Sequence, residues 1–143
     1  MTEQHLINAF GGESMAHMRY LHFANQAEKE DYTNVTRLFR AIAHAEYIHA
    51  GDHCRELKHL NNGFVANSMA AFGPGGTRKN LWLAIAGATF EITEMYPACI
   101  EVARMVNENG ACRSFEWSSA TEKMHKALFE QAPLVRPAGL PQA

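Results

Sequence analysis

A glutamate and a histidine occur together, three positions apart, at two places in this chain. The first pair is Glu46 and His49, and the second is Glu122 and His125. Residues three apart on a helix lie on one face, so each pair would present a carboxylate and an imidazole from a single turn. One such pair alone is weak, because most are solvated contacts on a helix surface. Two pairs in separate helices are what a carboxylate-bridged site for two metal ions in a four-helix bundle requires.

Two further carboxylates complete the candidate site. Glu13 lies on the face that carries Phe10 and Tyr20, and Glu91 lies on the inner face of a third helical stretch. Four carboxylates in an apolar interior would repel one another, whereas two divalent cations would cancel their negative charge. The candidate metal ligands are Glu13, Glu46, His49, Glu91, Glu122 and His125.

This set of donors indicates both the metal and the chemistry. Carboxylate oxygens with two imidazoles suit iron or manganese, and zinc or copper would also bind such a site tightly. So few ligands leave coordination positions open for a bound O–O group. The reaction classes are then reduction of hydrogen peroxide, reduction of oxygen, or oxidation of ferrous iron. The phenols of Tyr20 and Tyr96 can hydrogen-bond to the carboxylates or donate protons.

The elements that must hold these residues are helices, because helical periodicity dominates the chain and no segment alternates as a strand does. We expect helices over residues 3–30, 35–60, 77–108 and 111–131, with Thr33 or Asn34 capping the second and Thr77 capping the third. Pro97 should kink the third helix just after Tyr96. Asn109 and Gly110 should end it. The fold class is therefore all-α: a four-helix bundle in one domain over 1–132, followed by a C-terminal tail over 133–143.

The connection between the second and third helices is rich in Gly, Pro and small residues over 67–77. Such a composition marks a loop. A tight hairpin would place the third helix antiparallel to the second, whereas a connection of this length can cross the bundle. We expect the long crossover.

The two halves of the chain resemble each other. The segment 10–13 can be laid on 85–88 at an offset of 75 positions, and Glu46 and His49 match Glu122 and His125 at an offset of 76. A duplicated helical hairpin predicts pseudo-twofold symmetry, with each half contributing half of the site. Glu13 then corresponds to Ala88, which is not a carboxylate. The nearest acid is Glu91, one turn later, and Glu94 lies further round the helix.

Composition excludes several classes of function. The chain is 47% hydrophobic and 20% charged, with a formal net charge of -2, so we expect neither a nucleic-acid nor a membrane-surface protein. No apolar run is long enough to span a membrane, and the first residues lack the basic start of a signal peptide, so the expected location is cytoplasmic. The three cysteines are widely spaced without a C-x-x-C pair, and we interpret them as packing residues.

Several other residues have a structural interpretation. His17 and His53 lie near the inner faces of their helices, where we expect them to support the site or border the core rather than bind metal. Trp82 and Trp117 are interpreted as core packing residues.

These motifs together resemble the rubrerythrin family. The resemblance covers about 6–131, and its motifs coincide in order and spacing over 9–14, 19–20, 38–43, 45–50, 94–97 and 120–125. It implies a ferritin-like four-helix bundle with a non-haem, carboxylate-bridged di-iron site. It also implies peroxidase activity on hydrogen peroxide. The family's metal ligands carry over onto the six candidates named above, and its tyrosines near the metals onto Tyr20 and Tyr96.

Two departures from the family pattern matter. Rubrerythrins usually have a glutamate at the position of Ala88, and its loss would weaken one metal position, open it to water, or let Glu91 move between metals. Typical members also append a rubredoxin-like domain with paired C-x-x-C motifs. This sequence contains no C-x-x-C motif, so we expect the single-domain, erythrin-type variant. Its electrons would come from a separate donor protein such as a rubredoxin, or through an NADH-linked carrier. We also expect a homodimer, in which helices can be exchanged between the two chains.

Two alternatives to the peroxidase remain open. One is an iron-handling protein that oxidises ferrous iron with oxygen or peroxide. The other is a metal-binding bundle with one position degraded at Ala88.

Overall fold

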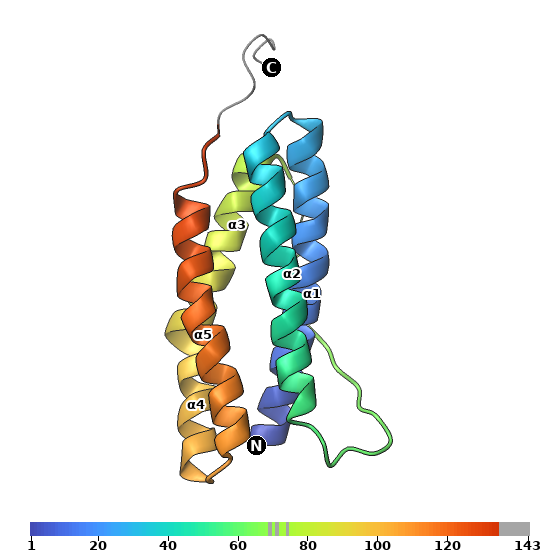
Figure 1. Ribbon diagram of the computed structural model, residues 1–143, viewed down its shortest axis with the longest axis vertical. Helices are drawn as coiled ribbons and strands as arrows, with labels where there is room; N and C mark the ends of the chain where they lie inside the picture. Colours follow the sequence, from blue (N-terminus) through green and yellow to red (C-terminus); the bar gives the residue numbers. More distant parts are fainter. Residues whose placement is uncertain (69, 71, 74, 135–143) are drawn as a thin grey trace.

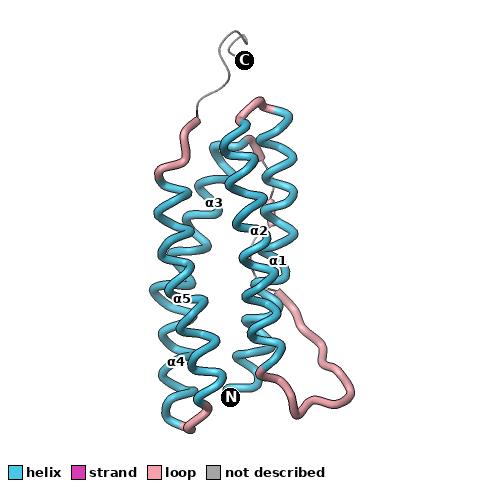
Figure 2. Tube along the Cα trace, viewed as in Figure 1, coloured by secondary structure: helices cyan, strands magenta, loops and turns pink. Residues whose placement is uncertain are grey.

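The computed structural model describes residues 1–68, 70, 72–73 and 75–134. Within these residues the chain is helical and contains no strand (Figure 2). The elements are α1 (Thr2–Lys29), α2 (Thr33–Arg55), α3 (Thr77–Phe90), the π-helix η1 (Glu91–Met95), α4 (Tyr96–Met105) and α5 (Asn109–Glu130). Because α3, η1 and α4 follow one another without a break, they act as a single long third helix.

The helices form two hairpins that pack side by side (Figure 1). In Figure 1, α1 and α2 make one hairpin, and the third helix makes the other with α5. The connection after α2 starts at the lower end of the bundle and rejoins the helices at the upper end, so α2 and α3 run in the same direction. The predicted all-α bundle with a long crossover between its second and third helices is therefore confirmed.

The π-helix accounts for the change of offset in the sequence repeat. Glu13 pairs with Ala88 at an offset of 75, while Tyr20 pairs with Tyr96 at an offset of 76. One extra residue must therefore be accommodated between Ala88 and Tyr96, and η1 lies there. A single π-turn inside an α-helix widens the turn and so accommodates such a residue. Pro97 stands in the first turn of α4, directly after the widened turn.

Two expected helix ends were wrong. Helix α2 ends at Arg55 rather than near residue 60. The third helix ends at Met105, and Asn107 then adopts a positive φ of 59°, so Gly110 belongs to the first turn of α5 instead of ending the preceding helix.

The expected capping residues were also wrong, because Tyr32 and Gly76 occupy the two N-cap positions. At the start of α3, the backbone N–H of Thr77 donates to a carboxylate oxygen of Glu30 at 3.0 Å. A carboxylate from the end of α1 therefore satisfies one of the free backbone donors at the start of α3. Of the expected C-terminal tail, residues 135–143 lie outside the described residues.

The interior consists of two apolar clusters with a polar layer between them. The upper cluster is built around Tyr20, Phe23, Phe39 and Phe129, and the lower cluster contains Leu6, Leu57, Tyr96 and Phe115. On each long helix, the candidate ligands fall in sequence between the residues of the two clusters. The apolar packing on both sides therefore fixes the helices that position this layer.

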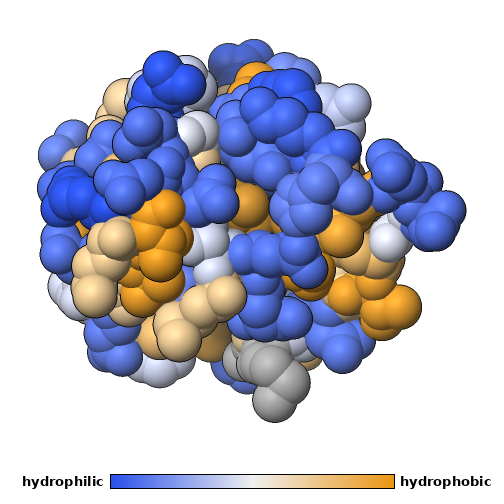
Figure 3. Space-filling view, turned by 90° about the horizontal axis from the view of Figure 1, so that it is seen from below, coloured by the Kyte–Doolittle hydropathy of each residue, from blue (hydrophilic) through white to orange (hydrophobic). Residues whose placement is uncertain are grey.

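Two predictions about packing, one for the tryptophans and one for the cysteines, do not agree with the exposure of these residues. Trp82 is 65% exposed and Trp117 is 61% exposed, so neither is a core residue. Leu81, the residue before Trp82, faces the core instead. Among the cysteines, Cys99 is buried but Cys54 is exposed, so the packing interpretation fails for Cys54. Seen from below, hydrophilic residues cover most of the bundle end with separate hydrophobic patches between them (Figure 3). None of the described helices is long and apolar enough to cross a membrane.

Candidate metal centre

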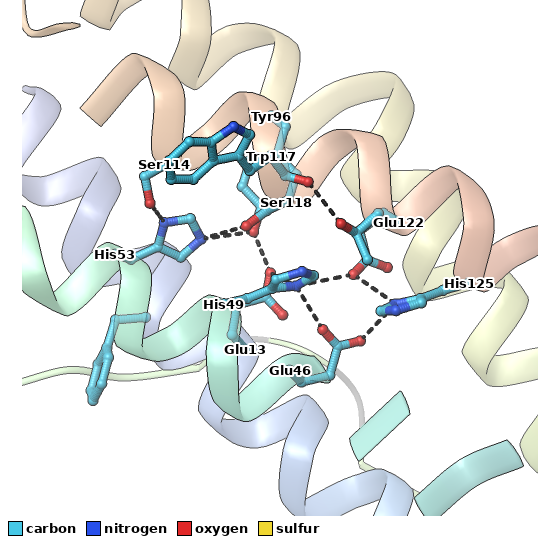
Figure 4. Close-up of polar contacts among 12 residues, drawn as sticks. Glu13, Glu46, His49, His53, Tyr96, Ser114, Trp117, Ser118, Glu122 and His125 are labelled. Atoms are coloured by element: carbon cyan, nitrogen blue, oxygen red, sulfur yellow. Dashed lines mark hydrogen bonds and ion pairs between the residues drawn. The ribbon is translucent and has the colours of Figure 1, made fainter. Parts of the chain in front are cut away.

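Five of the six candidate ligands meet in the polar layer. Glu13 comes from α1, Glu46 and His49 from α2, and Glu122 and His125 from α5. The three glutamates are each 1% exposed. Figure 4 shows the two imidazole rings among the carboxylates, and the ring centroids lie 5.8 Å apart.

Short distances connect these side chains. His49 Nδ1 lies 2.9 Å from a carboxylate oxygen of Glu46, 3.7 Å from Glu13 and 3.6 Å from Glu122. His125 Nδ1 lies 3.1 Å from Glu122 and 3.2 Å from Glu46. Glu46 and Glu122 each contact both histidines, so these two carboxylates are placed as bridging groups between the halves of the site.

The charges of the cluster explain its protonation. Burial and the charge of Glu46 raise the pKa of Glu13 to about 8. Burial also disfavours the charged form of Glu46, but the adjoining imidazoles of His125 and His49 outweigh this effect and lower the pKa of Glu46 to about 2. Burial lowers the pKa of each histidine, yet the adjoining carboxylates raise His49 to about 10 and His125 to about 9. Protons thus balance the negative charge when no cation does.

The cluster satisfies the requirements of a metal site in a further way. Glu13, Glu46, His49 and Glu122 each offer a ligand atom, and these atoms all lie within 4.8 Å of one another. One oxygen of each glutamate and Nδ1 of His49 are buried without a hydrogen-bond partner. Buried polar atoms are nearly always hydrogen-bonded or bound to a metal, because leaving them unpaired is costly. The residues present therefore fit a pair of divalent ions held by oxygen and imidazole ligands.

The sixth candidate, Glu91, lies at the edge of this cluster. It belongs to η1 and is partly buried, and it lies close enough to Glu122 for each carboxyl to influence the pKa of the other. Burial and the charge of Glu13 raise its pKa well above the usual value. Glu94 is exposed and stays away from the cluster. Ala88 is 1% exposed, so the position equivalent to Glu13 lies inside the bundle but offers no ligand atom.

The two candidate tyrosines have different polar partners. The phenol of Tyr96 donates a hydrogen bond to a carboxylate oxygen of Glu13. The phenol of Tyr20 instead accepts a hydrogen bond from Arg19 Nη2 at 3.4 Å. Both side chains are at most 2% exposed, and burial raises the pKa of both phenols. Both tyrosines are therefore neutral hydrogen-bonding groups, and only Tyr96 contacts a candidate ligand directly.

Two residues of this network, Ser114 and Ser118, were not predicted from the sequence. His53 is fully buried, and its Nδ1 lies 2.7 Å from Ser114 Oγ. Its Nε2 lies 3.0 Å from the Tyr96 hydroxyl and 3.3 Å from Ser118 Oγ. His53 was expected to support the site, but Ser114 and Ser118 were not singled out. The repeat would have found them, since their counterparts in the first half are apolar. The other supporting candidate, His17, hydrogen-bonds to the carbonyl of Ala43 at 2.6 Å.

Comparison with known proteins identifies this arrangement. The family model described as rubrerythrin matches residues 4–132. The chain is 45% identical over 134 residues to rubrerythrin-2 of Clostridium acetobutylicum, covering 92% of this chain and 72% of that protein. It is 40% identical over 130 residues to a rubrerythrin of Porphyromonas gingivalis, covering 90% of this chain and 64% of that protein.

A solved structure of nigerythrin in its fully reduced, all-ferrous state resembles the whole bundle. The TM-score is 0.85 at 30% identity, over 92% of this chain and 65% of that one. This chain thus spans about two thirds of the length of these relatives. Family match, sequence identity, fold and the buried Glu/His cluster all agree. The chain belongs to the rubrerythrin family of di-iron proteins.

Proposed function

We propose that this protein reduces hydrogen peroxide at its di-iron site, with electrons supplied by a separate donor protein. The observation that carries the proposal is the position of the Tyr96 hydroxyl, a buried hydrogen donor in contact with the candidate ligand Glu13. Reduction of hydrogen peroxide to two waters consumes two electrons and two protons. Two ferrous ions held at this site would supply the two electrons.

The residues of the chain have separate roles in this reaction. Glu46 and Glu122, which contact both histidines, hold the two halves of the site together. Glu13, Glu91, His49 and His125 complete the ligand set. Tyr96 keeps a hydrogen directed at Glu13, where it stabilises the carboxylate and could act as a proton donor. The apolar clusters above and below the layer exclude bulk water.

Glu91 marks the side from which a small oxidant reaches the site. It is the partly exposed member of the ligand set, whereas the other five are buried. It also lines a cavity of about 670 Å³ between α1 and the third helix, together with Gly12, Met15 and Phe90. Peroxide is small enough to enter through such an opening while the rest of the cluster stays enclosed.

Steady-state kinetics test the proposal. Iron-loaded protein with a reduced rubredoxin as electron donor should consume hydrogen peroxide over many turnovers, in proportion to donor oxidised. Tyr96→Phe removes the phenol hydrogen and keeps the ring, and it should lower kcat about tenfold or more, as loss of a proton-donating group does. A single turnover without donor-dependent recycling would contradict the proposal.

A second candidate function follows from Ala88. Because this position offers no ligand atom, one iron would be held by fewer protein groups than its neighbour. A weakly held iron favours uptake, oxidation and release, which is iron handling rather than peroxide turnover. Oxidation of several added ferrous ions per chain, without donor-dependent peroxide consumption, would select this alternative.

The donor and the assembly complete the proposal. We propose a rubredoxin-like or NADH-linked carrier as donor, and a homodimer whose interface covers exposed aromatic surface. Trp82 and Trp117 are large apolar side chains open to solvent, as interface residues are in a separated chain. Sedimentation of the wild type against Trp82→Lys and Trp117→Lys tests the dimer. A monomeric wild type would overturn it.

A further inference from the structure

The pseudo-twofold symmetry of the bundle reveals three polar residues that packing alone does not require. At the offset of 76 positions, His53 corresponds to Phe129, Ser114 to Leu38, and Ser118 to Ile42. Phe129, Leu38 and Ile42 are apolar, and they belong to or pack on the upper cluster that surrounds Tyr20. Their polar counterparts are 3% exposed or less. One half of the bundle thus uses apolar side chains where the other uses a buried polar trio.

The two environments otherwise have the same shape. The ring of Tyr20 lies 5.9 Å from Phe39 and 5.4 Å from Phe129, and those two rings lie 5.5 Å apart. The ring of Tyr96 lies 6.1 Å from Phe115 and 5.8 Å from His53, with 5.4 Å between the latter pair. An aromatic ring at position 53 therefore satisfies the packing, and the imidazole nitrogens add something that a phenylalanine lacks.

The directions of the hydrogen bonds show what the imidazole nitrogens of His53 contribute. A carboxylate ligand carries no hydrogen, so Tyr96 donates its single hydroxyl hydrogen to Glu13. The Tyr96 oxygen can then only accept from His53, which places a hydrogen on Nε2. The neutral imidazole leaves Nδ1 as an acceptor for the hydroxyl of Ser114. Burial, with the charge of His49, lowers the pKa of His53 to about 3, in agreement with a neutral ring.

We infer that His53 is a positioning residue for the metal centre: held by Ser114 and Ser118, it donates to Tyr96 and keeps the phenol hydrogen directed at Glu13. One oxygen of Glu13 is thereby engaged by Tyr96, while the other is buried without a hydrogen-bond partner and is available to a metal. The trio thus orients a candidate ligand through one intervening side chain. The Tyr20 half has no such device, and its phenol accepts from Arg19.

Nuclear magnetic resonance of the metal-free chain tests the inference without requiring activity, at a pH above the pKa of about 8 of Glu13 so that its carboxyl is ionised as it is in a metal ligand. Tyrosine labelled with ¹³C at Cζ reports the hydrogen bonding of each phenol oxygen, and Tyr96→Phe and Tyr20→Phe assign the two signals. His53→Phe copies the residue of the other half and should shift the Tyr96 signal while leaving Tyr20 unchanged. His53→Gln retains an N–H donor and should restore the signal toward wild type. Phe129→Leu is the matched control, expected to affect Tyr20 and not Tyr96.

A triple variant separates positioning from stability. His53→Phe leaves the hydroxyls of Ser114 and Ser118 without their partner, so it can destabilise the fold. Combining it with Ser114→Leu and Ser118→Ile copies the apolar half completely and removes those unpaired groups. If this variant folds and the Tyr96 signal still shifts, the trio positions the phenol. An unchanged Tyr96 signal in the folded triple variant, or in His53→Phe, would overturn the inference.

A kinetic measurement extends the test and rests on the proposed peroxidase function. In the iron-loaded protein, His53→Phe and the triple variant should lower kcat about tenfold with little change in KM, since misplaced groups slow chemistry more than binding. His53→Gln should recover part of kcat. If the wild type shows no peroxide turnover but the Tyr96 signal shifts as expected, the proposed function fails while the positioning role stands. Wild-type kcat in a triple variant whose Tyr96 signal is shifted would contradict any role of the trio in turnover.

Discussion

Tyr96 donates a hydrogen bond to Glu13 across the bundle, whereas its pseudo-symmetric counterpart Tyr20 accepts one from Arg19 and has Ala88 where Tyr96 has Glu13. Exact pseudo-twofold symmetry between the two hairpins would give the hydroxyls of Tyr96 and Tyr20 the same hydrogen-bond partners. One phenol therefore supports the metal centre directly, and the other is held by Arg19. The site is asymmetric in its supporting contacts as well as in its ligands.

Restoring the missing carboxylate should reveal this asymmetry. Ala88→Glu adds a further buried acid to a cluster that already holds four, so the metal-free variant should be less stable than wild type by about 1–3 kcal/mol. Ferrous iron should remove this deficit, because the new carboxylate gains a metal and Tyr20 gains an acceptor. Thermal unfolding with and without anaerobic iron measures both effects. A variant that iron stabilises no more than wild type would show that position 88 does not face the centre.

The metal-free protein should become less stable as pH rises from about 6.5 toward 10. Despite burial, the neighbouring carboxylates raise the pKa of His49 to about 10 and His125 to about 9, against an ordinary value of 6.5. Such histidines contribute stability that is complete below the unfolded value and is lost as pH rises through the folded one. Burial raises the pKa of Glu13 from 4.5 to about 8, so this group also makes the folded state less stable as pH rises. The pKa of Glu46 is lowered to about 2, so the stability that this carboxylate contributes is lost only in strong acid.

Thermal unfolding of the metal-free chain between pH 6.5 and 9 checks this dependence. The loss should exceed about 1 kcal/mol, because one unit of pKa shift corresponds to about 1.4 kcal/mol. The iron-loaded protein is the control, and it should not lose stability over this range because its ligands are already deprotonated. Equal pH dependence in the two forms would contradict the charge balance described for the cluster.

Metal binding should release protons. At pH 7, Glu13, His49 and His125 all have pKa values above the solution pH, so their three protons must leave when they become ligands. Calorimetric titration with ferrous iron in buffers of different ionisation enthalpy counts them, and we expect about three per chain or more. Iron affinity should accordingly weaken as pH falls. Binding without proton release would mean that these side chains are not the ligands.

Two adjacent glycines offer a matched test of the connection between the hairpins. A Cβ on Gly11 would overlap the backbone carbonyl of Asn67, whereas a Cβ on Gly12 meets nothing within 4 Å. Gly11→Ala should therefore destabilise the protein by about 1–3 kcal/mol through overpacking. Gly12→Ala should stabilise it by up to about 1 kcal/mol, since alanine favours a helix interior. Chemical denaturation measures both, and equal effects would place the Asn67 segment away from α1.

Much of this site could be predicted because helical spacing is regular. The Glu46–His49 and Glu122–His125 pairs were found from spacing alone, and the repeat located Ala88 as a gap. Helix ends were less predictable, because a carboxylate from elsewhere in the chain, Glu30, contacts the start of α3. Trp82 was misplaced because its neighbour Leu81 faces the core and periodicity does not decide between adjacent apolar residues.

The supporting network was harder to foresee for a physical reason. The repeat marks Ser114 and Ser118 as polar residues in place of Leu38 and Ile42, but only contact with His53 gives them a role. The π-helix was likewise visible only as a one-residue change in the repeat offset. Both features depend on contacts between helices rather than on the pattern within one.

The most direct test of the di-iron site is the number of ferrous ions that each chain binds under anaerobic conditions. We expect about two per chain at saturation, because Glu91 and the five buried ligands suffice without a carboxylate at position 88. Ala88→Glu should bind the same number more tightly. About one ion per wild-type chain, rising to two in Ala88→Glu, would show that Ala88 has removed the second position and would contradict a two-iron mechanism for this protein.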